Sequence, residues 1–154
     1  MPKKQRATEG TLARKAADLL AARPHFKKEL RDKLVKRGYD NKEVDELIDS
    51  FEERGYLNDR DHALLYIEEL KRKRFGKGEA LRRLTIKGFP KAESEKLLKA
   101  FFLENDEIAN IRYHLGKKKF NLDDVKEIKK AFDFLSRKGF SWDRIREVLK
   151  IENW

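Results

Sequence analysis

One short motif, written three times along the chain, places the strongest constraint on its fold. The motif reads Leu, two variable residues, a cation, Gly and an aromatic residue, and its glycines stand 50 and then 51 residues apart. The three copies are Leu34-Val-Lys-Arg-Gly38-Tyr39, Leu84-Thr-Ile-Lys-Gly88-Phe89 and Leu135-Ser-Arg-Lys-Gly139-Phe140. A repeat of this length indicates that one structural unit of about 50 residues occurs three times in tandem.

The spacing within the motif follows from the way helices end. A helix often stops at a residue in the left-handed conformation, where glycine is favoured because a side-chain Cβ would clash. The aromatic residue that follows is then expected to pack back on the leucine four positions before the glycine, as Tyr39 would on Leu34. A cation just before the glycine suits the negative end of the helix dipole. The motif therefore predicts helix ends at Gly38, Gly88 and Gly139.

Apolar residues spaced by three and four positions mark a helix after each motif copy and another before each motif-ended helix. The helices after the motif carry Val44, Leu47, Ile48 and Phe51, then Leu97, Leu98 and Phe101, then Ile145, Val148 and Leu149. The leading helices carry Leu12, Ala16, Leu19 and Leu20, then Ala63, Leu64, Ile67 and Leu70, then Ile108, Ile111 and Leu115. We therefore predict an all-α, elongated chain of three tandem three-helix, helix-turn-helix-like repeats at residues 8–56, 57–104 and 105–154.

Local signals place several helix boundaries. The leading helices are expected to end before Pro24, near Gly76 and near Gly116. The middle helix of the third repeat is expected to be the longer one, over residues 123–138. The candidates for helix starts are Asp40 with Glu43 as a capping box, Asn58 and Ser141 as N-caps, and Pro90 in a first turn.

Composition narrows the class of protein. The chain has no cysteine, which excludes disulfides and thiolate metal sites. No apolar run approaches the ~18 residues of a membrane span, and no apolar stretch follows the charged start at residues 1–6, so a signal peptide is not expected. These features predict a cytoplasmic monomer without membrane contact. The net charge of +10 favours polyanions or acidic protein surfaces as partners.

Residues that could carry out chemistry do not cluster in the sequence. His25, His62 and His114 stand apart without a helical partner at i, i+4, and they are expected to be exposed or half-buried polar residues. Asp123 and Asp124 suit a helix first turn better than a metal cradle. No phosphate-binding glycine loop is present, since Gly76-Lys77-Gly78 is too short for one. We therefore expect no enzyme activity, no metal and no cofactor.

Basic residues gather in two clusters. The first basic cluster holds seven cations within residues 71–83, and its members are Lys71, Arg72, Lys73, Arg74, Lys77, Arg82 and Arg83. The second basic cluster consists of Arg112, Lys117, Lys118 and Lys119. Residues 40–61, in contrast, hold nine acidic and three basic residues. The clusters predict contacts with phosphate or acidic side chains, against the alternative of an ordinary solvated face on a highly charged protein.

The helix pairs joined by a glycine turn also match the pattern of a helix-turn-helix. Reading bases in a DNA groove would require Asn, Gln and Arg on the exposed face of the recognition helix. The third helices of the first two repeats instead begin with the acidic segments Lys42-Glu-Val-Asp-Glu and Lys91-Ala-Glu-Ser-Glu. Sequence-specific DNA recognition is therefore not expected of those two repeats.

The segment Gly55-Tyr56-Leu57-Asn58-Asp59-Arg60-Asp61-His62-Ala63 resembles the signature of the RecX family, roughly Gly-Tyr/Leu-x-Asp/Asn-Asp-x-x-Phe-Ala. The resemblance continues through a basic helix, a short glycine turn and the ending Leu-x-x-Lys-Gly, and it is strongest over residues 55–101. His62 departs from the family's Phe, which suggests a partly polar core contact there. The residues expected to have structural roles are Gly38, Gly55, Tyr56, Leu57, Asn58, Asp59, Ala63, Gly88 and Gly139.

The resemblance implies a modulator of the RecA recombinase. Proteins of that family lie in the groove of the RecA–DNA filament and reduce ATP hydrolysis and strand exchange. By this resemblance the partners are the RecA filament and single- or double-stranded DNA, the latter bound weakly or through the filament. Two other functions stay open at this point, namely general DNA binding through phosphate contacts and an adaptor for an unrelated acidic protein.

Overall fold

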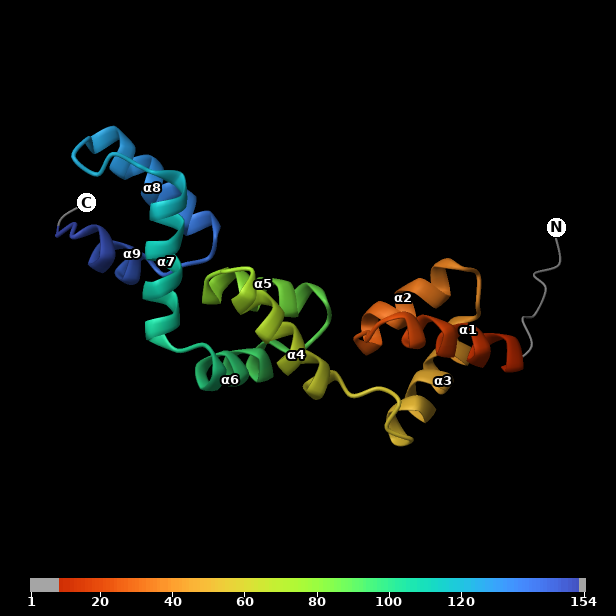
Figure 1. The fold of residues 1–154 in the computed structure, drawn as a ribbon. Coiled ribbons are helices and arrows are strands. Elements are labelled where there is room, and N and C mark those ends of the chain that lie inside the picture. The colour runs from red at the N-terminus through yellow and green to blue at the C-terminus, as the bar shows by residue number, and fades with distance from the viewer. Residues whose placement is uncertain (1–8, 153–154) are drawn as a thin grey trace. The chain divides into compact units, whose positions relative to one another are not determined.

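The computed structural model describes residues 9–152, and within them it contains nine α-helices and no strand (Figure 1). In chain order they are α1 (Glu9–Ala22), α2 (Lys27–Lys36), α3 (Asn41–Glu53), α4 (Asp59–Arg72), α5 (Lys77–Ile86), α6 (Lys91–Phe101), α7 (Glu104–Lys118), α8 (Val125–Arg137) and α9 (Trp142–Leu149). The prediction of an all-α chain of three-helix repeats is confirmed. The outer limits predicted for the first and last repeats, and the expectation about residues 1–6, lie outside the described residues.

The described residues form two compact units. The first unit contains the chain up to Ala63 together with Lys87–Phe89, and the second contains Leu64–Ile86 and the chain from Pro90 onward. The core of the first unit is built from α1, α2 and α3, with Leu12, Leu30, Leu34, Val44 and Ile48 among its buried side chains. In the second unit Ile111, Leu135, Phe140 and Ile145 form a cluster that joins α7, α8 and α9. The boundaries of the three sequence repeats stay a prediction.

The glycines of the repeated motif end their helices as predicted. Gly38, Gly88 and Gly139 have φ angles of +94°, +91° and +90°, and Gly55, which lies outside the motif copies, has +78°. At the end of α2, Tyr39 donates its N–H to the carbonyl of Leu34 at 3.3 Å, and Gly38 donates to Val35 at 2.9 Å. The same two bonds recur at Gly55 and Gly139, which is the Schellman arrangement. The predicted left-handed helix ends at Gly38, Gly88 and Gly139 are therefore confirmed.

Two other helices end at residues that the sequence did not indicate. α4 was predicted to end near Gly76; it stops at Arg72, and Arg74, not the glycine, takes the left-handed position with a φ of +58°. α7 runs through Gly116 and closes at Lys119, whose φ is +52°. A left-handed residue with a side chain costs roughly 1–2 kcal/mol. At Arg74 the strain is offset by a hydrogen bond from its guanidinium to Asn110.

Gly76 and Gly78 have a different task from the one predicted. They lie against the turn that ends α8, where Gly76 donates its N–H to Lys138 at 2.8 Å and Gly78 donates to Gly139 at 2.9 Å. A Cβ on Gly76 would come within 2.3 Å of the carbonyl carbon of Gly139. Glycine is needed here because two backbone turns touch, a long-range contact that no local pattern reveals.

Most of the predicted helix starts are confirmed. Asp40 accepts the N–H groups of Lys42 and Glu43, Asn58 accepts that of Asp61, and Ser141 accepts that of Arg144. Pro90 is the N-cap of α6, one position before the predicted first turn. α8 is the longer middle helix, as predicted, with 13 residues against 10 in α2 and α5.

One residue predicted for an apolar core stripe is exposed. Phe101 is 44% exposed at the last position of α6, whereas Phe102 is 2% exposed. Phe102 leaves helical geometry with φ −113° and ψ 86°, and its side chain is buried. The helical spacing had instead predicted Phe101 for the buried position. The periodicity therefore failed at the residue where the helix stopped.

Replacing Gly139 with alanine should strongly destabilise the second unit. The new Cβ would be held at positive φ and would lie 2.2 Å from the backbone nitrogen of Glu79. We expect a loss of about 2–4 kcal/mol, which lowers the melting temperature by about 2–4 °C for each kcal/mol. Thermal unfolding followed by circular dichroism measures this shift.

Gly116→Ala is the matched control. Gly116 lies inside α7 with open space around its Cβ position, so alanine should leave the stability unchanged or raise it by up to about 1 kcal/mol. Equal melting temperatures for the Gly139→Ala and Gly116→Ala proteins would contradict the packing described for Gly139.

Candidate functional site

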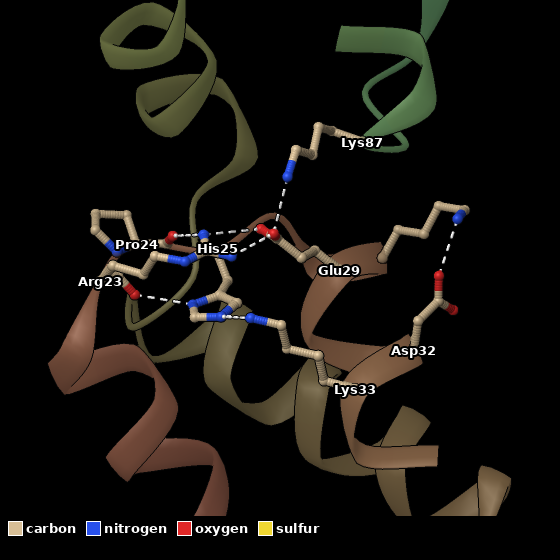
Figure 2. Close-up of polar contacts among 8 residues, drawn as sticks. Arg23, Pro24, His25, Glu29, Asp32, Lys33 and Lys87 are labelled. Carbon is tan, nitrogen blue, oxygen red and sulfur yellow. Dashed lines mark hydrogen bonds and ion pairs between the residues drawn. The ribbon is translucent and has the colours of Figure 1, made fainter. Parts of the chain in front are cut away.

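A buried histidine organises the charged residues of the first unit (Figure 2). His25 is 3% exposed, and its Nε2 lies 2.8 Å from the ammonium of Lys33. Because an ammonium can only donate, Nε2 accepts and the ring is neutral. Nδ1–H then donates to the carbonyl of Arg23 at 2.8 Å. His25 therefore fixes both the chain before α2 and the side chain of Lys33.

The burial of His25 corrects the expectation that the histidines are exposed or half-buried. His114 is also buried, and its Nε2 donates to the carbonyl of Arg74 at 2.8 Å. His62 alone is half-buried, with its ring centroid 4.2 Å from that of Phe26, in agreement with a partly polar core contact. The sequence could not show this burial because the hydrogen-bond partner of His114 lies 40 residues away along the chain.

Glu29 carries two ion pairs in the same network. Arg23 and Lys87 donate to its carboxylate at 2.6 Å and 3.0 Å, as Figure 2 shows. Burial pushes the pKa of Glu29 upward, but the hydrogen bonds from Arg23 and Lys87 outweigh it and lower the pKa to about 2. The carboxylate is therefore ionised at neutral pH and anchors the Lys87–Phe89 turn, which belongs to this unit.

The signature segment at residues 55–63 forms structural contacts in the first unit. Leu57 and Ala63 are buried, and the ring of Tyr56 meets that of Phe51 edge-on at 5.5 Å. Asp59 accepts the N–H of Lys27 at 2.9 Å, and burial raises the pKa of the Asp59 carboxyl. The segment joins the start of α4 to the start of α2.

The first basic cluster divides into exposed and engaged side chains. Arg72, the last residue of α4, and Lys73 just after it are exposed, although Lys73 pairs with Glu69 at 2.7 Å. Lys71 is only 26% exposed and donates to the carbonyl of Phe101 at 3.1 Å, which satisfies the end of α6. This part of the cluster therefore supplies one exposed cation, Arg72, for which no ion pair occurs among the described residues.

Three arginines of the first basic cluster are engaged in contacts within the second unit. The guanidinium of Arg74 lies 4.1 Å from the ring centroid of Tyr113, and that of Arg83 lies 4.2 Å from the centroid of Phe75. Arg82 and Arg83 both bind Glu79, at 2.7 Å and 2.8 Å. Their hydrogen bonds lower the pKa of Glu79 to about 2, with Arg82 the larger contributor. These cations are less available to a partner than their sequence density indicated.

The second basic cluster is exposed along the end of α7. Arg112, Lys117, Lys118 and Lys119 all face solvent, with the ammonium of Lys118 5.1 Å from the ring centroid of Phe134. Lys119 has a local task as well, because its N–H closes α7 on the carbonyl of Leu115 at 3.0 Å. Arg112 lies within α7 and the three lysines at its end, so the exposed cluster follows the second half of this helix.

A third basic surface was not predicted. Lys33, Lys36 and Arg37 at the end of α2 line a hollow of about 420 Å³ in the first unit. Their spacing of i, i+3 and i+4 places them on one helix face, which is the signal that could have revealed them. Within residues 9–152 no group of three His, Asp or Glu side chains could hold a metal ion. None of the helices in that range is long and apolar enough to span a membrane.

The fold defines a class of protein, an all-helical tandem array of three-helix modules. The family models for the first and third three-helix domains of RecX match residues 14–51 and 105–149. The regulatory protein RecX of Vibrio vulnificus is 33% identical over 89% of this chain and 90% of its own length. The regulatory protein RecX of Pelodictyon phaeoclathratiforme is 31% identical over 88% of this chain and 85% of its own length. The chain belongs to the RecX family.

Solved structures agree with this assignment at the level of the fold. A crystal structure of a regulatory protein RecX superposes with a TM-score of 0.81 at 17% identity, covering 94% of this chain and 72% of its own. The RecX of Lactobacillus salivarius superposes with a TM-score of 0.77 at 19% identity, covering 92% of this chain and 94% of its own. The three-helix architecture is therefore shared at low sequence identity.

The charged network of the first unit predicts a loss of stability on mild acidification. Burial lowers the pKa of His25 and of His62 from 6.5, so the unfolded chain binds protons first as the pH falls below that value. The free energy of unfolding should then decline by at most about 1.4 kcal/mol per pH unit for each histidine. Stability should fall again between pH 4.5 and about 2. In this range the unfolded chain has protonated Glu29, whereas the folded chain keeps it ionised.

Urea unfolding at a series of pH values measures these losses, with His25→Gln as the comparison. The two proteins should show parallel stability above pH 7, and the variant should show the shallower decline below 6.5. An identical pH dependence for both proteins would contradict a neutral, buried His25.

Proposed function

We propose that this protein is a negative modulator of the RecA recombinase that acts without enzymatic activity of its own. In this proposal it binds in the groove of the RecA–DNA filament as a cytoplasmic monomer, and it suppresses ATP hydrolysis and strand exchange. The observation that carries the proposal is family membership, because 89% of the chain aligns with a regulatory protein RecX at 33% identity. The exposed cations of α4 and α7 support it, since a filament groove offers phosphates and carboxylates.

The proposed contacts fall on the exposed members of the basic clusters. Arg72, Arg112, Lys117 and Lys119 are exposed, and no side-chain ion pair involves them among the described residues. Lys71, Lys73, Lys77, Arg82 and Lys118 are secondary candidates. Arg74 and Arg83 were predicted as contacts too. Their guanidinium groups lie over aromatic rings and make hydrogen bonds, which supports a packing role.

Titrating the protein into the cognate RecA on single-stranded DNA should suppress ATP hydrolysis. The triple variant Arg72→Glu, Lys117→Glu, Lys119→Glu should need about tenfold more protein for the same suppression, because it reverses three contacts. The rate of ATP hydrolysis against protein concentration is the measurement. Unchanged hydrolysis at saturating wild-type protein would disprove the proposed function.

A charge-matched control uses Lys42→Glu, Arg54→Glu and Arg60→Glu. These three cations are exposed in the first unit, within the acidic stretch of residues 40–61. The control protein should suppress hydrolysis as the wild type does. Equal weakening in both triple variants would mean that net charge, and not the position of the cations, governs the effect.

The alternative function is general DNA binding through phosphate contacts, which the same exposed cations favour. It predicts binding to naked DNA whose log affinity falls with log salt by about 0.9 for each phosphate neutralised. Neutralising Lys117, Lys118 and Lys119 with glutamine should then flatten the slope by up to about 3. Absence of binding to naked DNA at low salt would eliminate this alternative and leave the filament proposal intact.

A further inference from the structure

A groove of about 800 Å³ lies in the second unit, away from both basic clusters except at Lys77. It is bounded by α5, α6, the start of α7, the end of α8 and the turn between α8 and α9. Leu81, Leu98 and Phe140 supply an apolar lining, and each comes from a different element. Leu98 and Phe140 are 1% and 3% exposed, so buried core residues preform the floor of the groove.

The groove lining holds three cations and three carboxylates, and Arg82 and Arg83, which bind one of those carboxylates, make the local charge positive. Lys77, Lys99 and Arg137 line it together with Glu79, Glu95 and Glu107. Glu79 is already bound by Arg82 and Arg83, and Glu107 is buried and accepts the N–H of Lys77 at 3.2 Å. Only Glu95 remains as an exposed carboxylate, whereas none of the three cations makes a side-chain ion pair within residues 9–152.

The rigidity of the groove comes from the glycine contact beneath it. Gly76 and Gly78 hold the Gly139 turn through two backbone hydrogen bonds, so the α8–α9 side is fixed against the start of α5. Ser136 also lines the groove, and its buried Oγ has no hydrogen-bond partner in the described part of the chain.

We propose that the groove binds an acidic protein segment that packs a bulky apolar side chain against Leu81, over a floor formed by the nearly buried Leu98 and Phe140. The carboxylates of that segment pair with Lys99 and Arg137 at the rim. A phosphodiester backbone fits less well, because it offers nothing to the apolar lining. Building on the proposed function, the segment belongs to the recombinase, and the groove is a contact separate from the exposed cations of α4 and α7.

The absence of cysteine from the chain allows a direct test by cross-linking. Lys99→Cys, labelled with a benzophenone maleimide, is mixed with the cognate recombinase on single-stranded DNA, irradiated and analysed by mass spectrometry. Lys126→Cys on the exposed side of α8 is the matched control. We expect cross-links from position 99 to one recombinase segment rich in Asp and Glu with a large apolar residue, and none to that segment from position 126.

A cross-link from position 99 to DNA, to a basic segment or to nothing would overturn the proposal. A second arm compares Lys99→Glu/Arg137→Glu with the control Lys126→Glu/Lys129→Glu in binding to the recombinase. The groove variant should bind about tenfold more weakly than the control, with equal affinity for naked DNA. Equal binding of both variants would overturn the proposal for the groove alone. Failure of the wild type to bind the recombinase would overturn both the proposed function and the proposal for the groove.

Discussion

The rest of this structure depends on one backbone constraint, the left-handed glycine that ends a helix. At Gly38, Gly55 and Gly139 two backbone hydrogen bonds close the helix, and the chain reverses there toward the next helix. At Gly139 the same backbone also receives the N–H groups of Gly76 and Gly78. A helix end thereby becomes a contact between modules of the second unit.

Local chemistry explains how much could be predicted from the sequence. The helix stops, the N-caps and the apolar stripes all depend on residues within one or two turns, and almost all of these predictions are confirmed. The errors occur where distant residues decide the outcome. Arg74 can close α4 because α7 binds it, and Gly76 is a glycine because the Gly139 turn touches it.

The same reasoning applies to the candidate sites. A density of cations in the sequence indicates a charged surface, but it does not say which cations are engaged. Arg74, Arg82 and Arg83 are held by rings or by Glu79, while the cations of α7 remain exposed. The groove could not be predicted at all, because its lining residues come from α5, α6, α7 and the α8–α9 turn.

Electron cryomicroscopy of the cognate RecA–DNA filament with this protein bound tests the central claim most directly. The account predicts density for three-helix modules along the filament groove, with the end of α7 facing the filament. Filaments that carry no added density at saturating protein, or that carry it only on the outer surface, would contradict a regulator that works through the groove.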